Sequence, residues 1–359
     1  MALYELVLAA VGLLGFLVVG YKWMIAVARL WSFAMVLLPA WGRPLRGYFG
    51  CGIVRNVYYG PEPGHPAPRG PASPGPLLYR ITRNYLDLYL PYGGESKGNK
   101  KSPVAILVWG GAWTIGYKLW PFILAQSLAK HGVLCVVVDY RNFPQGNVDV
   151  MVEDIERAIF WVHANIGRYA GDTDNITLVG QSAGAHLTTL SVLRNAQRPP
   201  EDRYHVRKYV GISGAYNIVD LGPILDRHGL DQNLFMAIMG EDLKSHSPFH
   251  LLKEAALDTP ALPLITLVHG TKDKTIGPQF TMDFVEELRR KKIHVDWKLF
   301  SGKSHTDFFL EDMIEGVGDN FVNYLLEIIT EKPHDGPIKG QGFVSHSFFV
   351  NIARLVNPF

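Results

Sequence analysis

Five residues near the middle of this 359-residue chain, Gly180-Gln181-Ser182-Ala183-Gly184, form a G-x-S-x-G motif. An apolar run, Ile176 to Val179, precedes the motif, and a run of helix-forming residues, Ala185 to Leu190, follows it. A strand, a sharp turn and a helix in this order expose a serine hydroxyl above the edge of a sheet. The motif therefore predicts a nucleophilic serine, Ser182, held on a strained turn.

A serine hydroxyl becomes a useful nucleophile only beside a base, and the base needs an acid that orients it. Two later apolar runs end in suitable residues: Leu264–Val268 leads to Asp273, and Val295–Phe300 leads to His305. The order serine, acid, histidine is that of the α/β-hydrolases. We therefore predict a catalytic triad of Ser182, Asp273 and His305, although each of the three alone could be an ordinary loop residue.

The negative oxygen that forms when a serine attacks a carbonyl needs backbone N–H donors. One donor is expected directly after the nucleophile, and another in the loop after the apolar run Val104–Val108. That loop reads Trp109-Gly110-Gly111-Ala112-Trp113, close to the H-G-G-G loop of lipases and esterases, with Trp109 where histidine is usual. The expected oxyanion and substrate-binding residues are Gly110, Gly111, Ala112, Gln181 and Ala183.

Several other polar residues near these motifs are more simply explained as structural. We expect His186 to pack or make a structural hydrogen bond on the helix after the nucleophile, and His269 to fix the loop that carries the acid. His163 is expected at the surface of a helix. Asp307, two residues after His305, is a rival acid, but it suits the beginning of the last helix better.

Alternating strand and helix patterns must position these residues, and they predict an α/β fold with a mostly parallel, doubly wound sheet. The predicted strands are Leu86–Leu90, Val104–Val108, Val133–Val138, Ile176–Val179, Tyr209–Ile212, Leu264–Val268 and Val295–Phe300. The predicted helices are Leu119–His131, Val150–Asn165, the run after the nucleophile, Phe280–Arg290 and Asp312–Ile329. We assign residues 77–332 to this catalytic domain, with the less regular segment 216–262 as a possible cap over the site.

Residues 1–41 are predicted to be a membrane anchor of one or two apolar segments. Residues 2–20 carry a single charge, Glu5, and have nearly the length that a bilayer requires. A second apolar stretch, Trp23–Trp41, follows, and no basic residue precedes the first, which argues against a removed signal peptide. With a single span, the basic residues after it place the catalytic domain in the cytosol.

The segments on either side of the catalytic domain have different compositions. The segment 42–76 is rich in proline and glycine toward its end, and this composition predicts a linker. In the tail, residues 333–359, apolar residues recur at helical spacing. This spacing predicts an amphipathic helix that lies either on a membrane or on the protein's own surface.

The composition also limits the possible functions. Hydrophobic residues make up 48% of the chain and charged residues 19%, which favours membrane contact or a large buried sheet. The net charge of +2 gives no reason to expect nucleic-acid binding. Two cysteines, Cys51 and Cys135, do not form a disulfide framework, so we expect a reducing compartment. No zinc-finger-like pattern of paired cysteines and histidines occurs, and we expect neither a metal nor another cofactor.

Four segments together resemble the isoprenylcysteine α-carbonyl methylesterases, which belong to the hormone-sensitive-lipase-like branch of the α/β-hydrolases. The resemblance covers roughly Leu86 to Ile329, and the closing Asn357-Pro358-Phe359 is also similar to the end of that family. The segments are Trp109-Gly110-Gly111-Ala112-Trp113-Thr114-Ile115-Gly116-Tyr117-Lys118, Asp139-Tyr140-Arg141-Asn142-Phe143-Pro144-Gln145-Gly146, Gly180-Gln181-Ser182-Ala183-Gly184-Ala185-His186 and Gly302-Lys303-Ser304-His305-Thr306-Asp307.

This resemblance implies an esterase that removes the methyl ester from a prenylated C-terminal cysteine, with Ser182 as nucleophile, Asp273 as acid and His305 as base. It further implies contact with membrane lipid at the endoplasmic reticulum or Golgi, with the catalytic domain facing the cytosol, and no cofactor. Trp109 departs from the small or polar residue usual in the family, which leaves the substrate open. The alternatives are an esterase for other hydrophobic, lipid or carboxyl esters, an arylformamidase, and a non-catalytic binding module.

Overall fold

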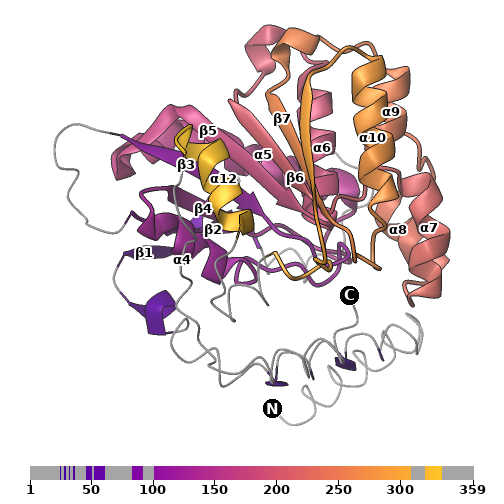
Figure 1. Ribbon diagram of the computed structural model, residues 1–359, viewed down its shortest axis with the longest axis horizontal. Coiled ribbons are helices and arrows are strands. Elements are labelled where there is room, and N and C mark those ends of the chain that lie inside the picture. The colour runs from indigo at the N-terminus through magenta and orange to yellow at the C-terminus, as the bar shows by residue number, and fades with distance from the viewer. Residues whose placement is uncertain are drawn as a thin grey trace.

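The structure is a computed structural model that describes residues 25, 28, 29, 32, 35, 36, 46–50, 52–60, 83–91, 101–308 and 320–333. These residues build an eight-stranded sheet with helices on both faces (Figure 1). The strands are β1 (Ile53–Tyr58), β2 (Tyr85–Tyr89), β3 (Ser102–Val108), β4 (Leu134–Val138), β5 (Gly171–Gln181), β6 (Lys208–Ile212), β7 (Leu264–Gly270) and β8 (Val295–Phe300).

The strand order is β1-β2-β4-β3-β5-β6-β7-β8. Strands β1 and β2 are antiparallel to each other, β2 is antiparallel to β4, and all other neighbours are parallel. Because parallel neighbours need crossover connections, the chain passes through a helix between most of them. The predicted mostly parallel, doubly wound sheet is therefore confirmed.

The helices form one layer on each side of the sheet. Helices α4 and α12 supply side chains to the hydrophobic core on one face, and α5, α6, α7, α8, α9 and α10 supply the core on the other. The α-helices are α4 (Phe122–Lys130), α5 (Val148–Asn165), α6 (Ala183–Asn195), α7 (Ile218–Arg227), α8 (Gln232–Met239), α9 (Pro248–Glu254), α10 (Gln279–Arg290) and α12 (Asn320–Thr330). Short 3₁₀ helices are η2 (Ile166–Tyr169), η3 (Pro200–Asp202) and η4 (Thr259–Ala261).

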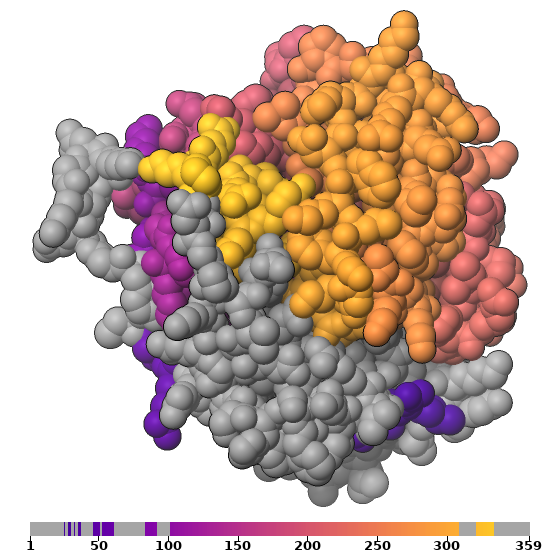
Figure 2. Space-filling view, viewed as in Figure 1, coloured from indigo at the N-terminus to yellow at the C-terminus, as the bar shows by residue number. Residues whose placement is uncertain are grey.

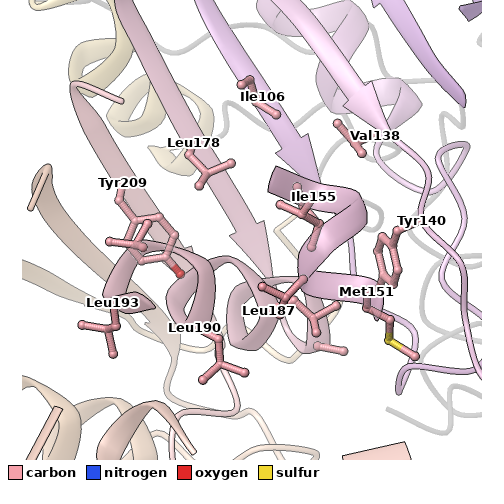
Figure 3. Close-up of a cluster of buried hydrophobic side chains, with 14 of the residues drawn as sticks. Ile106, Val138, Tyr140, Met151, Ile155, Leu178, Leu187, Leu190, Leu193 and Tyr209 are labelled. Carbon is pink, nitrogen blue, oxygen red and sulfur yellow. The ribbon is translucent and has the colours of Figure 1, made fainter. Parts of the chain in front are cut away.

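Successive residues of the central strands pack alternately in the two hydrophobic cores. In β3, Ile106 packs with the core on the side of α5, whereas Leu107 packs with the core on the side of α4. Figure 3 shows part of the first core, where Ile106 and Leu178 of the strands lie near Ile155 of α5 and Leu187 of α6. A strand that is apolar on both faces is therefore buried on both, as the continuous apolar runs predicted.

Helix α12 closes the second core against the last strand. Phe300 of β8 contacts Phe321 and Tyr324 of α12, with ring centroids 5.8 and 5.9 Å apart. Figure 2 shows α12 (yellow) beside the orange surface of the preceding chain. We predicted this helix from Asp312, but the described helix begins at Asn320, and residues 309–319 lie outside the described ranges.

One strand was missed by the sequence analysis. Residues Ile53–Tyr58 fall in the predicted linker 42–76, yet they form β1 and pair with β2 at the edge of the sheet. The linker assignment is wrong for this stretch, because Ile-Val-Arg-Asn-Val-Tyr contains neither proline nor glycine and is rich in strand-forming residues.

Across the described ranges, no helix has both the length and the apolar character needed to cross a bilayer. Most of the predicted anchor (1–41), much of the linker (42–76) and nearly all of the tail (333–359) lie outside the described residues. The possible cap, 216–262, forms α7, α8, α9 and η4. Its position over the site stays a prediction.

Candidate active site

Three strand ends bring the predicted triad together. Ser182 follows β5, Asp273 follows β7 and His305 follows β8, and all three side chains are buried. Ser182 Oγ lies 2.9 Å from His305 Nε2, and His305 Nδ1 lies 2.7 Å from Asp273 Oδ2. These are hydrogen-bond distances, so a proton can pass from the serine to the histidine while the carboxylate stabilises the charged ring.

The turn that carries Ser182 is strained in the way that a nucleophile elbow requires. Ser182 has φ 55° and ψ −122°, a conformation that a non-glycine residue rarely adopts, and α6 begins directly after it. Its amide donates to the carbonyl of Ile212 in β6 at 2.9 Å. Gly184 lets α6 approach β3, because a Cβ there would lie 2.2 Å from the carbonyl oxygen of Val108.

The Asp273 carboxylate accepts hydrogen bonds on both oxygens. Oδ1 accepts from the amides of Thr275 and Ile276, at 2.9 and 3.0 Å. Oδ2 faces Nδ1 of His305 and, at 3.1 Å, Nε2 of His269. Burial opposes ionisation of Asp273, but the two histidines outweigh burial and hold the pKa of this carboxyl well below its ordinary value. The carboxylate is therefore ionised at neutral pH, as an acid that stabilises a charged base must be.

The loop after β3 is pressed against the nucleophile. An ideal Cβ on Gly110 would lie 2.7 Å from Cβ of Ser182 and 2.8 Å from the carbonyl oxygen of Gln181. The next three residues, Gly111 to Trp113, all have positive φ (142°, 46° and 60°). This turn brings the loop beside Ser182 and the first amide of α6, where an oxyanion hole is needed. The donor roles of Gly111, Ala112 and Ala183 stay predictions.

A Gly110→Ala variant tests the position of this loop. The added methyl group meets backbone and the Ser182 side chain, so the loop must move away from the nucleophile, and we expect kcat to fall about 10²- to 10³-fold, the cost of losing an oxyanion donor. Steady-state ester hydrolysis with a melting curve for each variant measures this. Gly167→Ala is the control, because a Cβ there has no neighbour within 4 Å. Wild-type kcat in both variants would contradict the placement.

Hydrogen bonds to its own carbonyl groups hold the loop after β3, here called the oxyanion loop, on the side of β4. Tyr140 Oη donates to the carbonyl of Trp109 at 2.9 Å, and Asn142 Nδ2 donates to that of Gly116 at 2.7 Å. Arg83, which the sequence analysis did not identify, donates to the same Gly116 carbonyl at 2.5 Å and forms an ion pair with Asp139 at 2.6 Å. The segment after β4, together with Arg83, which lies outside the motifs, therefore sets the shape of the oxyanion loop.

The side chain of Gln181 lies beside the base: its Nε2 atom is 3.4 Å from His305 Nε2 and 3.5 Å from the His305 carbonyl oxygen. Its part in substrate binding stays a prediction. Asp307 was predicted to lie at the beginning of the last helix, and this stays a prediction because residues 309–319 lie outside the described ranges. Asp307 Oδ2 accepts from the Ser304 amide at 2.6 Å and steadies the turn that carries His305.

His186 has the structural role that we predicted. Trp113 Nε1 of the oxyanion loop donates to His186 Nδ1 at 3.1 Å, and His186 Nε2 donates to the His246 carbonyl at 2.7 Å. The neutral ring satisfies both contacts, and it ties the helix of the nucleophile to the oxyanion loop and to the segment before α9. Burial lowers the pKa of His186 to about 3, although the His246 carbonyl favours the charged ring.

This pKa predicts a loss of stability in acid. Between the ordinary histidine pKa of about 6.5 and the folded value, the unfolded chain binds a proton that the folded chain does not, so the free energy of unfolding falls as pH falls. The His186 contribution should be complete above about pH 7 and about 2 kcal/mol smaller at pH 5. Urea unfolding of the wild type and His186→Phe at both pH values measures this difference. An equal pH dependence in the two proteins would contradict the buried neutral ring.

The comparisons with known proteins agree with this geometry. Residues 86–288 match the family model BD-FAE. Isoprenylcysteine α-carbonyl methylesterase ICME of Arabidopsis thaliana is 33% identical over 97% of this chain and 80% of its own length. The probable isoprenylcysteine α-carbonyl methylesterase ICMEL1 of Oryza sativa subsp. japonica is 36% identical over 90% of this chain and 73% of its own.

Solved esterase structures share the fold. The native esterase 2 of Thermogutta terrifontis superimposes with a TM-score of 0.52 at 23% identity, over 69% of this chain and 86% of that one. Esterase B from Lactobacillus rhamnosis gives 0.59 at 17% identity, over 80% and 89%. With the mostly parallel sheet, these likenesses establish the α/β-hydrolase fold. The chain belongs to the isoprenylcysteine α-carbonyl methylesterase family, a family of carboxylic ester hydrolases.

Proposed function

We propose that this protein is a serine esterase that hydrolyses the C-terminal methyl ester of prenylated cysteine. The hydrogen-bonded chain from Ser182 Oγ through His305 to Asp273 supports the reaction type. The names of the relatives that match most of the chain support the substrate.

The reaction proceeds through an acyl-enzyme. Ser182 Oγ attacks the ester carbonyl carbon while His305 Nε2 takes the hydroxyl proton, and Asp273 stabilises the imidazolium that forms. The amides of Gly111, Ala112 and Ala183 bind the oxyanion. His305 then gives its proton to the leaving methoxide, and methanol departs. Water, activated by the same histidine, releases the free carboxylate and restores Ser182.

We also propose that residues 1–41 attach the enzyme to membrane lipid of the endoplasmic reticulum or Golgi, with the catalytic domain in the cytosol. The apolar composition of this segment supports the attachment. A prenylated ester partitions into a bilayer, so an anchored enzyme meets its substrate at a high local concentration. The organelle is an expectation from the family resemblance.

Hydrolysis of S-farnesylcysteine methyl ester beside a short p-nitrophenyl ester tests the substrate. The full chain, solubilised in detergent, should have a much higher kcat/KM for the prenylated ester, because the prenyl group contributes binding energy that a short acyl chain lacks. Turnover of the short ester alone would support a general carboxylesterase, and turnover of N-formylkynurenine alone an arylformamidase. Either result would overturn the methylesterase assignment.

A further inference from the structure

A second histidine shares the carboxylate of the triad. His269, at the end of β7, has no exposed surface, and its Nε2 atom lies 3.1 Å from Asp273 Oδ2. The same oxygen accepts from His305 Nδ1 at 2.7 Å. The other contacts of the His269 ring are from Nε2 to the Ile276 carbonyl oxygen at 2.8 Å and from Nδ1 to Thr281 Oγ1 at 2.7 Å.

These contacts determine which nitrogen of His269 carries the proton. Nε2 faces two oxygen atoms that can only accept, the Ile276 carbonyl and the Asp273 carboxylate, so Nε2 is the protonated nitrogen of the neutral ring. Nδ1 is then an acceptor, and the hydroxyl of Thr281 on α10 donates to it. Without the Thr281 hydroxyl, Nδ1 would be a buried acceptor with no donor, and one of the contacts that fix the ring would be lost.

The two oxygens of Asp273 are held in different ways. Oδ1 is anchored by two backbone amides of its own loop, which no side-chain substitution removes. Oδ2 faces two side chains and lies 2.7 Å from His305 Nδ1 and 3.1 Å from His269 Nε2. A donor on Oδ2 withdraws electron density from the oxygen that orients the base, and it also restricts where that oxygen can lie. Its loss therefore changes both the position of His305 and its basicity.

We propose that His269, held in place by Thr281, is a positioning residue for the reaction. It holds Asp273 Oδ2 toward His305 and keeps the basicity of His305 lower than Asp273 alone would make it. The hydrogen-bonded chain of the active site thus extends from Ser182 to Thr281 on α10. This inference rests on the triad roles given under the proposed function.

The rate at which a fluorophosphonate labels Ser182, measured across pH on the full chain, tests this role without any assumption about the ester substrate. In His269→Met, which cannot donate, we expect labelling at pH 8 to slow about 10- to 100-fold, the range seen when outer partners of metal-bound ligands are removed. We expect the midpoint of its acid limb, the pH at which labelling falls to half on the acid side, to rise, because Asp273 then attracts the proton on His305 more strongly. Besides His269 itself, the titratable groups of this hydrogen-bonded chain are Asp273 and His305. The other partners of the His269 ring, Ile276 and Thr281, are uncharged.

Two further variants separate positioning from packing. His269→Gln places an amide N–H near the position of Nε2, so most of the rate and the wild-type midpoint should return. Thr281→Val keeps the histidine but removes the donor to its Nδ1, so the ring is held less firmly, and it should slow labelling about 3- to 10-fold, the equivalent of one neutral hydrogen bond. If His269→Met does not fold, Thr281→Val still tests the proposal.

The outcomes are distinct. A wild-type midpoint in His269→Met, equal rates in the Met and Gln variants, or an unchanged rate in Thr281→Val would each overturn the positioning role. Labelling of the wild type without turnover of any ester would overturn the proposed function and leave this inference standing.

Discussion

Replacing Ser182 with alanine will reduce kcat for ester hydrolysis by roughly 10⁵- to 10⁶-fold, the loss expected when a serine nucleophile is removed from an intact triad. The variant keeps the rest of the site, so KM should change little. Activity that remains comes from substrate binding and the oxyanion donors, which still act on an attacking water. Single-turnover and steady-state rates with the preferred ester measure the effect, and fluorophosphonate labelling should be absent.

Ser213→Ala provides the matched control for this experiment. Ser213 follows β6, the strand whose last carbonyl accepts from the Ser182 amide, and its side chain is also buried. Among the described residues, no hydrogen bond is formed by its hydroxyl. Loss of that hydroxyl should leave kcat within a few-fold of wild type. Retained turnover and labelling in Ser182→Ala would contradict the assignment of Ser182 as the nucleophile.

The proximity of the three predicted triad residues could be predicted because each stands just beyond the carboxyl end of a parallel strand. Ser182, Asp273 and His305 are far apart in sequence, but β5, β7 and β8 run in the same direction, so their carboxyl ends lie along one edge of the sheet. The apolar runs before each residue identify those strands without knowledge of any contact. In such a sheet, strand direction and chain order determine most of the site.

The parts of the site that escaped prediction depend on contacts between distant loops. Arg83 precedes β2 and reaches the carbonyl of Gly116, and neither residue carries a spacing signal that relates it to the other. Asp139 and Arg141 are two residues apart in one loop but do not pair with each other: Asp139 pairs with Arg83, and Arg141 with Asp154. The sequence suggests that such charged residues form ion pairs, but the fold determines which residue is the partner of each.

The position of the Gln181 side chain follows from the alternation of residues along β5. Val179 packs in the core on the side of α4 and α12, and Phe308, which follows His305 closely, packs in the same core. Residues two apart in a strand point to the same face, so Gln181 shares the face of Val179 and hence the side of His305. Strand alternation in β5 therefore accounts for the contact between Gln181 and His305.

Replacing Asp273 with asparagine will lower kcat by roughly 10⁴-fold, although the change is a single atom, because the amide forces His305 into the wrong tautomer. The amides of Thr275 and Ile276 both donate to Oδ1, so the asparagine oxygen must stay at that position. Its NH₂ group then takes the position of Oδ2, where His305 Nδ1 has no acceptor for its proton. The ring moves that proton to Nε2, and it can no longer accept the proton of Ser182.

Asp307→Asn distinguishes this effect from a general loss of charge near the base. Asp307 is the rival acid and is also buried, but its contact with the Ser304 amide needs only an acceptor oxygen, which asparagine retains. Its kcat should therefore stay within about 10-fold of wild type, the cost of weakening one charge-assisted hydrogen bond. Circular dichroism and urea unfolding confirm that both variants are folded before kcat is compared. A larger loss in Asp307→Asn than in Asp273→Asn would transfer the role of acid to Asp307, and the 2.7 Å contact between His305 and Asp273 would then have no catalytic consequence.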